Sequence, residues 1–344
     1  MDFRYARGDT VTQKNGTCDV VCLPKQKKAV RCKWIFKRKE GLSPSEPPRL
    51  KARLVEKGFS QIPIVDYNDV FSLVVKHSSI RTFFGIVAMR DLELEQLDVK
   101  TAFLHGELEE EIYMDQPEGF IVPGKEDHVC KLKRSLYGLK QSPRQWYKRF
   151  DSFMMSHGFK RSEFDSCVYI KFVEGSPIYL LLYVDDMLIA AKSKKEITTL
   201  KKLLSSEFEM KDLGAAKKIL GMEITRDRNS GLLFLSQQSY IKKVHRFNMH
   251  DAKSVSTPIA PHFKLSALQC ASTDKNFEHM SRAPCSSDVG SLMYAMVCSR
   301  PDLSYALSLV SRYMANPGKE HWKASVDFQV PSWHNKCLFE VWQD

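Results

Sequence analysis

Two apolar runs separated only by a pair of aspartates constrain the fold of this chain more than any other feature. Residues 178–184 (IYLLLYV) and 187–191 (MLIAA) carry no charge, which is typical of strands that are buried on both faces of a sheet. Asp185 and Asp186 stand between them, so the chain must turn back at two acids. The sequence therefore predicts a buried hairpin with two carboxylates at its tip, although Asp-Asp is also common in plain surface turns.

Strand and helix patterns precede this hairpin. Residues 92–99 read as a strand with Asp98 near its end. A helix is predicted to begin with Ser142 as its cap and Pro143 at the first helical position, and to stop at Gly158. Its apolar residues at helical spacing are Trp146, Phe150, Phe153 and Met154, and we interpret Trp146 and Phe150 as helix core.

A second helix and a further strand follow the hairpin. Ser193 and Glu196 form a capping box that opens the helix, and residues 219–224 then read as a strand. The apolar face of this helix comprises Ile197, Leu200, Leu204 and Phe208. The resulting order, β-α-β-β-α-β, is the ferredoxin-like topology, an antiparallel sheet with two helices on one face. Polymerase palms share this topology, but so do proteins of many other functions.

The acids of the predicted sheet should lie together. In this topology the strand that ends at Asp98 is a neighbour of the strand that follows Asp186, so three carboxylates would meet at one edge of the sheet. Such a cluster requires cations, and hard oxygen ligands suit Mg²⁺. Two ions held in this way can catalyse an in-line phosphoryl displacement. The sequence therefore favours a two-metal phosphoryl-transfer site.

Positive charge is concentrated in the first part of the chain, whose formal net charge is +11. Residues 25–57 contain twelve Lys or Arg and three Glu, with a Pro-rich loop at residues 43–48 between two strand-like segments. A basic hairpin with neighbouring rings at Trp34, Phe36 and Phe59 is typical of a nucleic-acid-binding surface. A solvated basic face that binds nothing is the alternative interpretation.

Composition disfavours several other classes of protein. The longest apolar run is far shorter than the roughly 20 residues of a membrane-spanning helix, and the first residues are polar and charged rather than an apolar signal core. The nine cysteines include no CxxC pair and no zinc-knuckle spacing, so neither a disulfide framework nor a zinc site is indicated. We expect no membrane partner and a reducing compartment.

Longer motifs resemble one known family. Residues 183–186 (YVDD) look like the reverse transcriptase catalytic box, and residues 96–106 (QLDVKTAFLHG) look like the first palm motif of copia-type LTR retrotransposons. Further similar blocks occur in the family's order at residues 51–58 (KARLVEKG), 112–120 (IYMDQPEGF), 135–147 (SLYGLKQSPRQWY) and 220–224 (LGMEI). The resemblance covers residues 14–323. It implies an α+β right-hand polymerase with fingers, palm and thumb, and a ferredoxin-like palm.

The resemblance also implies an organisation along the chain. The reverse transcriptase would span residues 14–258 and a thumb or connection-like helical region residues 259–323, while residues 324–344 form a tail unlike the family. The subdivisions would be fingers at about 14–91 and 106–138, palm at about 92–105 and 139–225, and the start of the thumb at about 226–258.

Roles in catalysis follow from the same resemblance. Asp98 and Asp185 would ligate two Mg²⁺ ions, for which Mn²⁺ is a possible substitute, with the carbonyl of Val99 assisting and Asp186 completing the acidic set. Phe103 falls at the family's sugar gate, where a ring would exclude the ribose 2′-hydroxyl; an ordinary core phenylalanine is the alternative.

Roles in substrate binding complete the set. Arg53 and one of Lys37 or Lys39 would hold the incoming deoxynucleoside triphosphate, although solvated lysines fit equally well. Tyr137 and Gly138 would lie against nucleotide and template, and Gly221 and Met222 would support the primer end. The expected partners are an RNA or DNA template with its primer, deoxynucleoside triphosphates, and the ribonuclease H and integrase segments of the element polyprotein, which this chain does not include.

Departures from the family leave alternatives open. Leu73 stands in place of a proline, Cys285 in place of a tyrosine and Asp288 in place of a small residue, and the likeness stops after residue 323. These features suggest a fragment of an element, cytoplasmic and within a virus-like particle if the element is intact. One alternative is an inactive remnant that binds nucleic acid without copying it. Another is a ferredoxin-like module that binds a protein.

Overall fold

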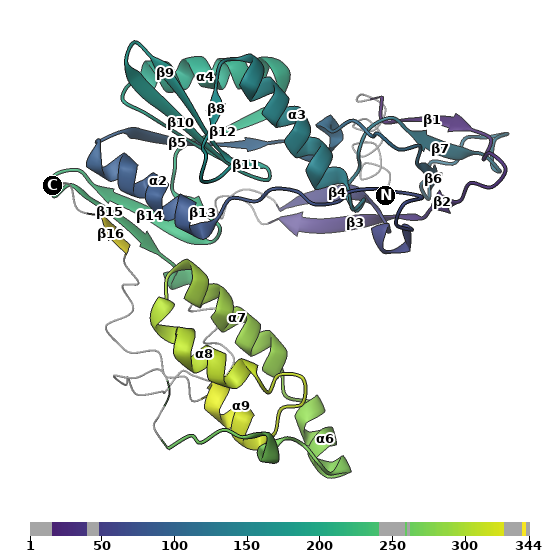
Figure 1. Ribbon diagram of the computed structural model, residues 1–344. Helices are drawn as coiled ribbons and strands as arrows, with labels where there is room; N and C mark the ends of the chain where they lie inside the picture. Colours follow the sequence, from purple (N-terminus) through teal and green to yellow (C-terminus); the bar gives the residue numbers. More distant parts are fainter. Residues whose placement is uncertain (1–15, 40–47, 241–258, 260–261, 327–338, 342–344) are drawn as a thin grey trace. The chain divides into compact units, whose positions relative to one another are not determined.

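The computed structural model of the chain describes residues 16–39, 48–240, 259, 262–326 and 339–341 (Figure 1). The chain divides into two compact units. The first unit comprises Met1–Lys76 and Glu95–Gly214, and the second comprises His77–Leu94 and Ala215–Asp344. Because helices and strands mix in both units, the predicted α+β class is confirmed.

A six-stranded sheet with two helices on one face forms the larger part of the first unit (Figure 1). Its strand order is β12-β5-β11-β10-β9-β8. The strands are β5 (Glu93–Val99), β8 (Lys160–Arg161), β9 (Val168–Val173), β10 (Ser176–Tyr183), β11 (Asp186–Ala191) and β12 (Met210–Ala215). Helices α3 (Ser142–Ser156) and α4 (Lys194–Glu207) contribute to the same hydrophobic core as the sheet. The buried hairpin that the sequence predicted is confirmed as β10 and β11.

Both helices form where their sequences predict, except that the predicted N-terminal cap of α3 is wrong. The predicted faces are buried, from Trp146 and Phe150 in α3 to Leu204 in α4. The capping box of Ser193 is present. The predicted cap at Ser142 was wrong, because the helix already includes this residue and its hydroxyl donates to the carbonyl of Leu136 instead of capping the helix.

The predicted position of the last strand of the β-α-β-β-α-β motif was also wrong. Residues 219–224 do not complete the six-stranded sheet; β12 does so, and it directly follows α4. The residues in question form β13 (Lys218–Ile219), a turn, and the start of β14 (Met222–Asp227) in a separate sheet. The strand β12 includes Lys211, Asp212 and Gly214, so its polar sequence hid it from a reading based on apolar runs.

The rest of the first unit holds a smaller sheet and a hairpin. The sheet, in the order β1-β7-β6-β2, is built from β1 (Cys18–Val21), β2 (Ala29–Val30), β6 (Tyr113–Asp115) and β7 (Val129–Leu132). Strands β3 (Cys32–Lys39) and β4 (Arg49–Glu56) pair antiparallel, which confirms the basic hairpin. Residues 43–47 of its Pro-rich loop lie outside the described residues. Short 3₁₀ helices η2 (Gly58–Ser60) and η3 (Ala102–His105) follow β4 and β5.

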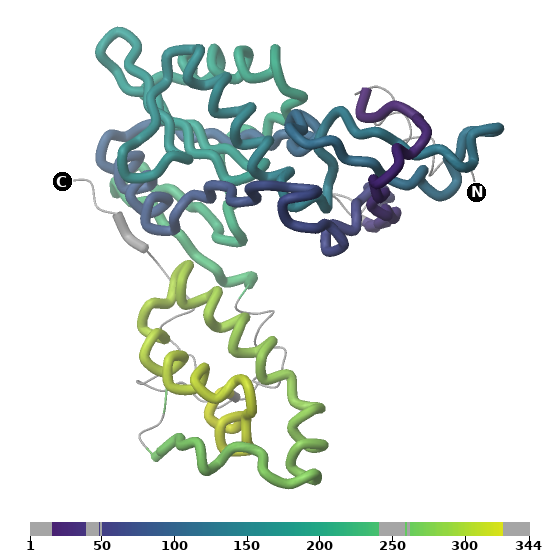
Figure 2. The backbone as a smooth tube through the Cα atoms, turned by 45° about the vertical axis from the view of Figure 1, so that its right-hand side comes forward, coloured from purple at the N-terminus to yellow at the C-terminus, as the bar shows by residue number. Residues whose placement is uncertain are grey.

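The second unit combines a sheet with a helical region. Helix α2 (His77–Met89) lies beside the strands of sheet β13-β14-β15-β16, although it comes from a distant part of the chain (Figure 2). The last two strands are β15 (Leu232–Ser236) and β16 (Phe339–Val341). The helical region contains η5 (Ala267–Gln269), α6 (Asp274–Ser281), α7 (Cys285–Cys298), η6 (Pro301–Leu303), α8 (Ser304–Ser311) and α9 (Lys319–Val326).

Three features of the second unit bear on the sequence predictions. Ala324, the first residue of the predicted tail, is fully buried in a core shared by α7, α8 and α9, so the tail does not depart from the fold at that position. Residues 241–258 of the predicted thumb lie outside the described residues. Among the helices that are described, none has the length and apolar character needed to span a membrane.

Candidate active site

Three aspartates meet where β5, β10 and β11 end or begin. Strands β5 and β11 are neighbours in the sheet, and the backbone N–H of Val99 donates to the carbonyl of Asp185 at 2.8 Å. Tyr183 pairs with Asp186 across the β10–β11 hairpin, which leaves Val184 and Asp185 as its turn. The structure thus brings together Asp98, Asp185 and Asp186, as the topology led us to expect.

The carboxylates of this cluster influence one another. Burial, and then the negative charges of Asp185 and Asp98, raise the pKa of Asp186 above its usual value. A hydrogen bond from the side-chain amide of Gln96 to Oδ1 of Asp186, at 3.2 Å, opposes this shift. The cluster therefore concentrates negative charge that a bound cation would offset.

The donor set suits a hard divalent cation. Carboxylate and backbone carbonyl oxygens are the ligands that Mg²⁺ prefers. In the described part of the chain, no three His, Cys, Asp or Glu side chains are grouped closely enough to hold a metal ion. The three aspartates fit a divalent ion by their ligand chemistry and charge, and not by a preformed arrangement of their oxygens.

An aromatic and cationic group lies beside the acids. The guanidinium of Arg53 lies 5.5 Å from the ring centroid of Tyr137, and the rings of Phe103 and Tyr137 are 5.0 Å apart. Burial raises the pKa of the Tyr137 hydroxyl, and the charges of Asp185 and Asp98 raise it further while Arg53 lowers it. Three residues that the sequence assigned to nucleotide binding are therefore close to each other, and Tyr137 is within electrostatic reach of the acids.

Comparisons with known proteins show the family of the chain. A model of the family described as reverse transcriptase (RNA-dependent DNA polymerase) matches residues 15–261. The chain belongs to this family. The resemblance to copia-type retrotransposon reverse transcriptases is thereby confirmed.

The curated relatives of this reverse transcriptase family member are transposon proteins. The chain is 58% identical over 314 residues to the retrovirus-related Pol polyprotein from transposon TNT 1-94 of Nicotiana tabacum, an alignment that covers 91% of the chain and 24% of the relative. It is 38% identical over 326 residues to the corresponding polyprotein from transposon RE1 of Arabidopsis thaliana, with 94% and 22% covered. It is 36% identical over 230 residues to a putative transposon Ty5-1 protein of Saccharomyces cerevisiae, with 65% and 71% covered. The chain thus spans about a quarter of the length of the first two relatives.

Four further residues of this reverse transcriptase family member have predicted roles in nucleotide binding or primer support. Lys37 is exposed on β3, opposite Lys51 in the register of the hairpin. Lys39 pairs with Arg49 in the same backbone register, and its side chain lies outside what the structure describes. Gly221 and Met222, assigned to primer support, belong to the turn and first position of β14 in the second unit.

Gly138 has a clear structural reason to be glycine. Its φ is +99°, and a Cβ at this position would lie 2.0 Å from the carbonyl oxygen of Glu56. The loop meets the end of β4 backbone to backbone, since the N–H of Glu56 donates to the carbonyl of Tyr137 at 2.7 Å. This close approach places Tyr137 next to the strand that carries Arg53.

Sequence reasoning assigned no site role to three residues that contact the acids or their loops. Gln96 lies two positions before Asp98 on β5, and because strand side chains alternate, this spacing could have placed both on one face. Trp146, interpreted as core, is buried but also donates from Nε1 to the carbonyl of Val184 at 2.6 Å. The ring of His105 lies near the backbone of Lys100, and burial lowers the pKa of this imidazole. Nothing in the local sequence indicates the last two contacts.

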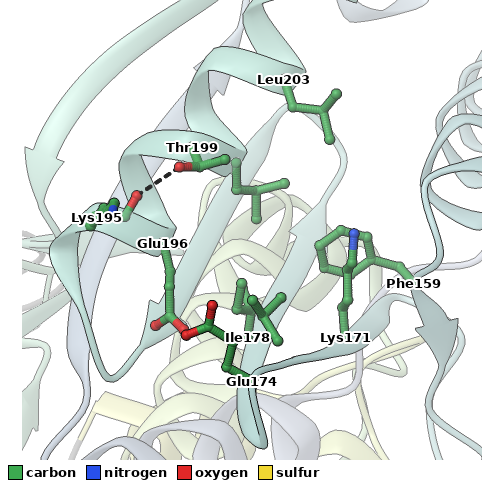
Figure 3. A pocket seen from close by; sticks show the side chains of 10 residues that line it. Phe159, Lys171, Glu174, Ile178, Lys195, Glu196, Thr199 and Leu203 are labelled. Atoms are coloured by element: carbon green, nitrogen blue, oxygen red, sulfur yellow. Dashed lines mark hydrogen bonds between the residues drawn. The ribbon is translucent and has the colours of Figure 1, made fainter.

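A cavity of about 240 Å³ in the first unit is separate from this site. It lies between α4 and the β9–β10 hairpin, with Phe159 and Lys171 across from Thr199 and Leu203 (Figure 3). Ile178, which lines it, is at the opposite end of β10 from Tyr183. Asp98, Asp185 and Asp186 therefore do not line this cavity.

Proposed function

We propose that this chain is the RNA-directed DNA polymerase segment of a copia-type Pol polyprotein, which extends a primer 3′-hydroxyl with deoxynucleotides on an RNA or DNA template. The observation that carries the proposal is the meeting of Asp98, Asp185 and Asp186 at adjacent strand ends, within a chain that matches the reverse transcriptase family. Three carboxylates so placed suit phosphoryl transfer better than the binding of a protein partner.

The architecture of the first unit supports a right-hand polymerase. In chain order, β5, α3, β10, β11, α4 and β12 follow the ferredoxin-like pattern, and their order in the sheet, β12-β5-β11-β10, is the one this topology requires. We assign this sheet to the palm. The β3–β4 hairpin and the small sheet beside it in the sequence correspond to fingers, and the segment after residue 225 corresponds to thumb and connection.

The acids would hold the catalytic ions. Asp98, Asp185 and Asp186 would supply carboxylate oxygens, and Val99 its carbonyl oxygen. When bound, Mg²⁺ would offset the charge that develops on the α-phosphate and favour the deprotonated primer hydroxyl; Mn²⁺ is the expected substitute. The residues of the chain contribute position and electrostatics, which account for most of the catalysis in phosphoryl transfer.

The group beside the acids would hold the nucleotide. Arg53 presents a planar guanidinium that can bind two phosphate oxygens at once, and its position over Tyr137 orients it. Phe103 packs against Tyr137 and is half-buried, so its ring has the bulk and the exposure that a gate against the 2′-hydroxyl requires. Exposed Lys37 on the hairpin would add charge for the triphosphate or for the template backbone.

Primer extension tests the proposal. The full chain should extend a DNA primer on an RNA template when Mg²⁺ and deoxynucleoside triphosphates are supplied, and should favour deoxynucleotides over ribonucleotides. Asp98→Asn, which keeps the shape of the side chain and removes its charge, is the matched control and should not extend. Binding of primer and template without extension by the parent chain would instead support an inactive remnant that retains its nucleic-acid surface.

A further inference from the structure

Two loops next to the acids, the turn at Val184 and Asp185 and the loop that follows Asp98, pass through strained backbone at a β-branched residue. Val184, directly before Asp185, has a φ of +55°, and Thr101, three positions after Asp98, has a φ of +53°. Positive φ is unfavourable for a residue with a branched Cβ and persists only where the surrounding structure maintains it. The position of each acid therefore depends on contacts that prevent its loop from relaxing.

A side chain of helix α3 holds the first of these loops. The indole Nε1–H of Trp146 donates to the carbonyl of Val184 at 2.6 Å, and only 1% of Trp146 is exposed. The acceptor is the backbone of the strained residue itself. A relaxed turn would rotate this carbonyl and leave a buried indole N–H without a partner, which is unfavourable.

A side chain of η3 lies against the second loop. The ring of His105 lies near the backbone carbonyl of Lys100, the residue between Val99 and the strained Thr101. Its Nε2 is buried and meets no hydrogen-bond partner among the described residues, so Nδ1 is the nitrogen that can donate to this loop.

The two supporting side chains belong to one buried group. The rings of His105 and Trp146 are 5.9 Å apart, and each lies 5.3 Å from the ring of Phe208. We propose that Trp146 and His105 form a positioning pair that holds the two loops beside the acids in register, so that Asp98 faces Asp185 and Asp186. This inference rests on the proposed function, because it gives the register of the acids its catalytic meaning.

The rival explanation is that Trp146 only stabilises the core, since any buried indole needs an acceptor. The hydrogen bond from the N–H of Val99 to the carbonyl of Asp185 distinguishes the two explanations, because it joins the segments of Asp98 and Asp185 directly. Its hydrogen exchange reports the register without any metal or substrate. Trp146→Phe, which keeps an aromatic ring and removes the donor, should accelerate exchange at Val99 by about tenfold relative to the change in global stability.

Phe150→Leu is the matched control for this substitution. Phe150 packs 5.5 Å from Trp146 in the same core but has no polar group that could contact either loop. It should lower the unfolding temperature as Trp146→Phe does, while exchange at Val99 follows global stability alone. For the second loop, His105→Phe should behave as Trp146→Phe, whereas His105→Asn keeps a donor near the position of Nδ1 and should restore exchange close to that of the parent.

Direct binding of Mn²⁺, measured by electron paramagnetic resonance on the full chain with primer and template, supplies the second readout. Trp146→Phe and His105→Phe should each weaken Mn²⁺ binding by about tenfold, the effect usual for residues that orient metal ligands. Phe150→Leu and His105→Asn should leave it within about twofold of the parent. Asp185→Asn removes a proposed ligand and gives the Mn²⁺ signal expected when the site is lost.

The outcomes separate this inference from the proposed function. Unchanged exchange at Val99 in Trp146→Phe, or an equal change in Phe150→Leu, would overturn the positioning role even if the chain extends primers. Faster exchange at Val99 in Trp146→Phe and His105→Phe, but not in Phe150→Leu or His105→Asn, would support the positioning role. This holds even if the parent chain neither extends primers nor binds Mn²⁺ through Asp185. In that case the proposed function, and not the positioning pair, would be wrong.

Discussion

The acidic strand ends and the basic β3–β4 hairpin, both in the first unit, hold opposite charges in different ways. Asp186 is half-buried, accepts a hydrogen bond from Gln96 and has a pKa raised by burial and by its neighbouring acids. Lys33 and Lys37 extend from the hairpin and are exposed. From this difference we expect the position of each charge to matter at the strand ends, and the number of charges to matter along the hairpin. Single substitutions should therefore act strongly at the first region and weakly at the second.

The largest expected effect is at Asp185. Asp185→Asn should lower the rate of primer extension by about 10³-fold or more, since several kcal/mol of charge stabilisation in the transition state would be lost. Affinity for primer and template should stay within about twofold, because the basic surface that we expect to contact phosphates is unchanged. Single-turnover extension and filter binding measure the two quantities. Extension at near the parent's rate would show that the acids do not form the active site.

The next effect concerns the contact that joins the hairpin to the loop beside the acids. Gly138→Ala places a Cβ 2.0 Å from the carbonyl oxygen of Glu56 and forces alanine to a φ of +99°. Backbone strain alone should cost about 1–3 kcal/mol of unfolding free energy, and the clash adds to it. Gly175→Ala is the control, because its φ is +79° and nothing lies within 4 Å of the added Cβ. Equal losses in urea unfolding would show that the close approach is unimportant.

Most of the acidic region could be predicted from sequence because its signals are local and periodic. Uncharged runs on both sides of Asp185 and Asp186 predicted the hairpin, and the capping box of Ser193 predicted the start of α4. The neighbouring position of Asp98 followed from topology. Strand β12 was missed because it is an edge strand of the sheet, where polar residues are tolerated and periodicity is weak.

Contacts between distant segments could not be predicted. Trp146 could be expected to need an acceptor, but only the folded backbone shows that this acceptor is Val184. The close approach of Gly138 to Glu56 likewise depends on a loop and the end of strand β4, which are far apart in sequence. On the hairpin, alternation predicts which residues share a face, yet it does not tell a nucleotide ligand from a solvated lysine. This is the reason that Lys37 and Lys39 stay predictions.

A smaller effect is expected at Phe103, an uncharged residue whose ring packs against Tyr137. Phe103→Val removes the ring that packs against Tyr137, so ribonucleotide incorporation should rise by about tenfold relative to deoxynucleotide, the discrimination that contacts worth 1–3 kcal/mol provide. Phe103→Tyr keeps the ring and should keep the ratio of the parent. Competitive incorporation of matched ribo- and deoxynucleotides measures it. An unchanged ratio in the valine variant would return Phe103 to a core role.

The buried end of the hairpin should respond to pH. Burial, and then Asp115 and Asp66, raise the pKa of Glu56 well above its usual value of 4.5, and neither carboxylate oxygen has a hydrogen-bond partner among the described residues. A raised pKa in the folded state means that stability is fully present below pH 4.5 and is lost as pH rises through the folded pKa. Glu56→Gln stays neutral, so it should be more stable than the parent at pH 8.

Urea unfolding at pH 5 and pH 8 tests this expectation. The advantage of Glu56→Gln over the parent should be larger at pH 8 than at pH 5, because the free energy needed to keep Glu56 protonated in the folded parent increases as the pH rises above 4.5. Glu163→Gln, at an exposed position, is the control and should follow the parent at both pH values. A constant difference between Glu56→Gln and the parent would mean that Glu56 is not held neutral in the folded chain.

The smallest effects are expected from single cations of the hairpin, and they distinguish template binding from nucleotide binding. Lys33→Gln should weaken template affinity modestly and make the slope of log affinity against log salt shallower by about 0.7–0.9, the change for one lost phosphate contact. Arg53→Gln should leave that slope nearly unchanged and raise the KM for nucleotide by about tenfold, because one charge-assisted hydrogen bond is lost. Lys202→Gln, at an exposed position on α4, is the control for both measurements.

Lys37→Gln then decides the role of the residue that sequence and structure leave between these two groups. Lys33 and Lys37 each lie two positions from Ile35, which pairs with Arg53, so all three cationic residues share one face of the hairpin and the face alone does not assign Lys37 to either group. If Lys37 holds the triphosphate, its variant should raise the KM for nucleotide and leave the salt slope of template binding unchanged, as Arg53→Gln does. A shallower slope with an unchanged KM would place Lys37 on the template path with Lys33. The exposed hairpin would then act on nucleic acid through its number of charges, and Arg53 at its half-buried end through its position.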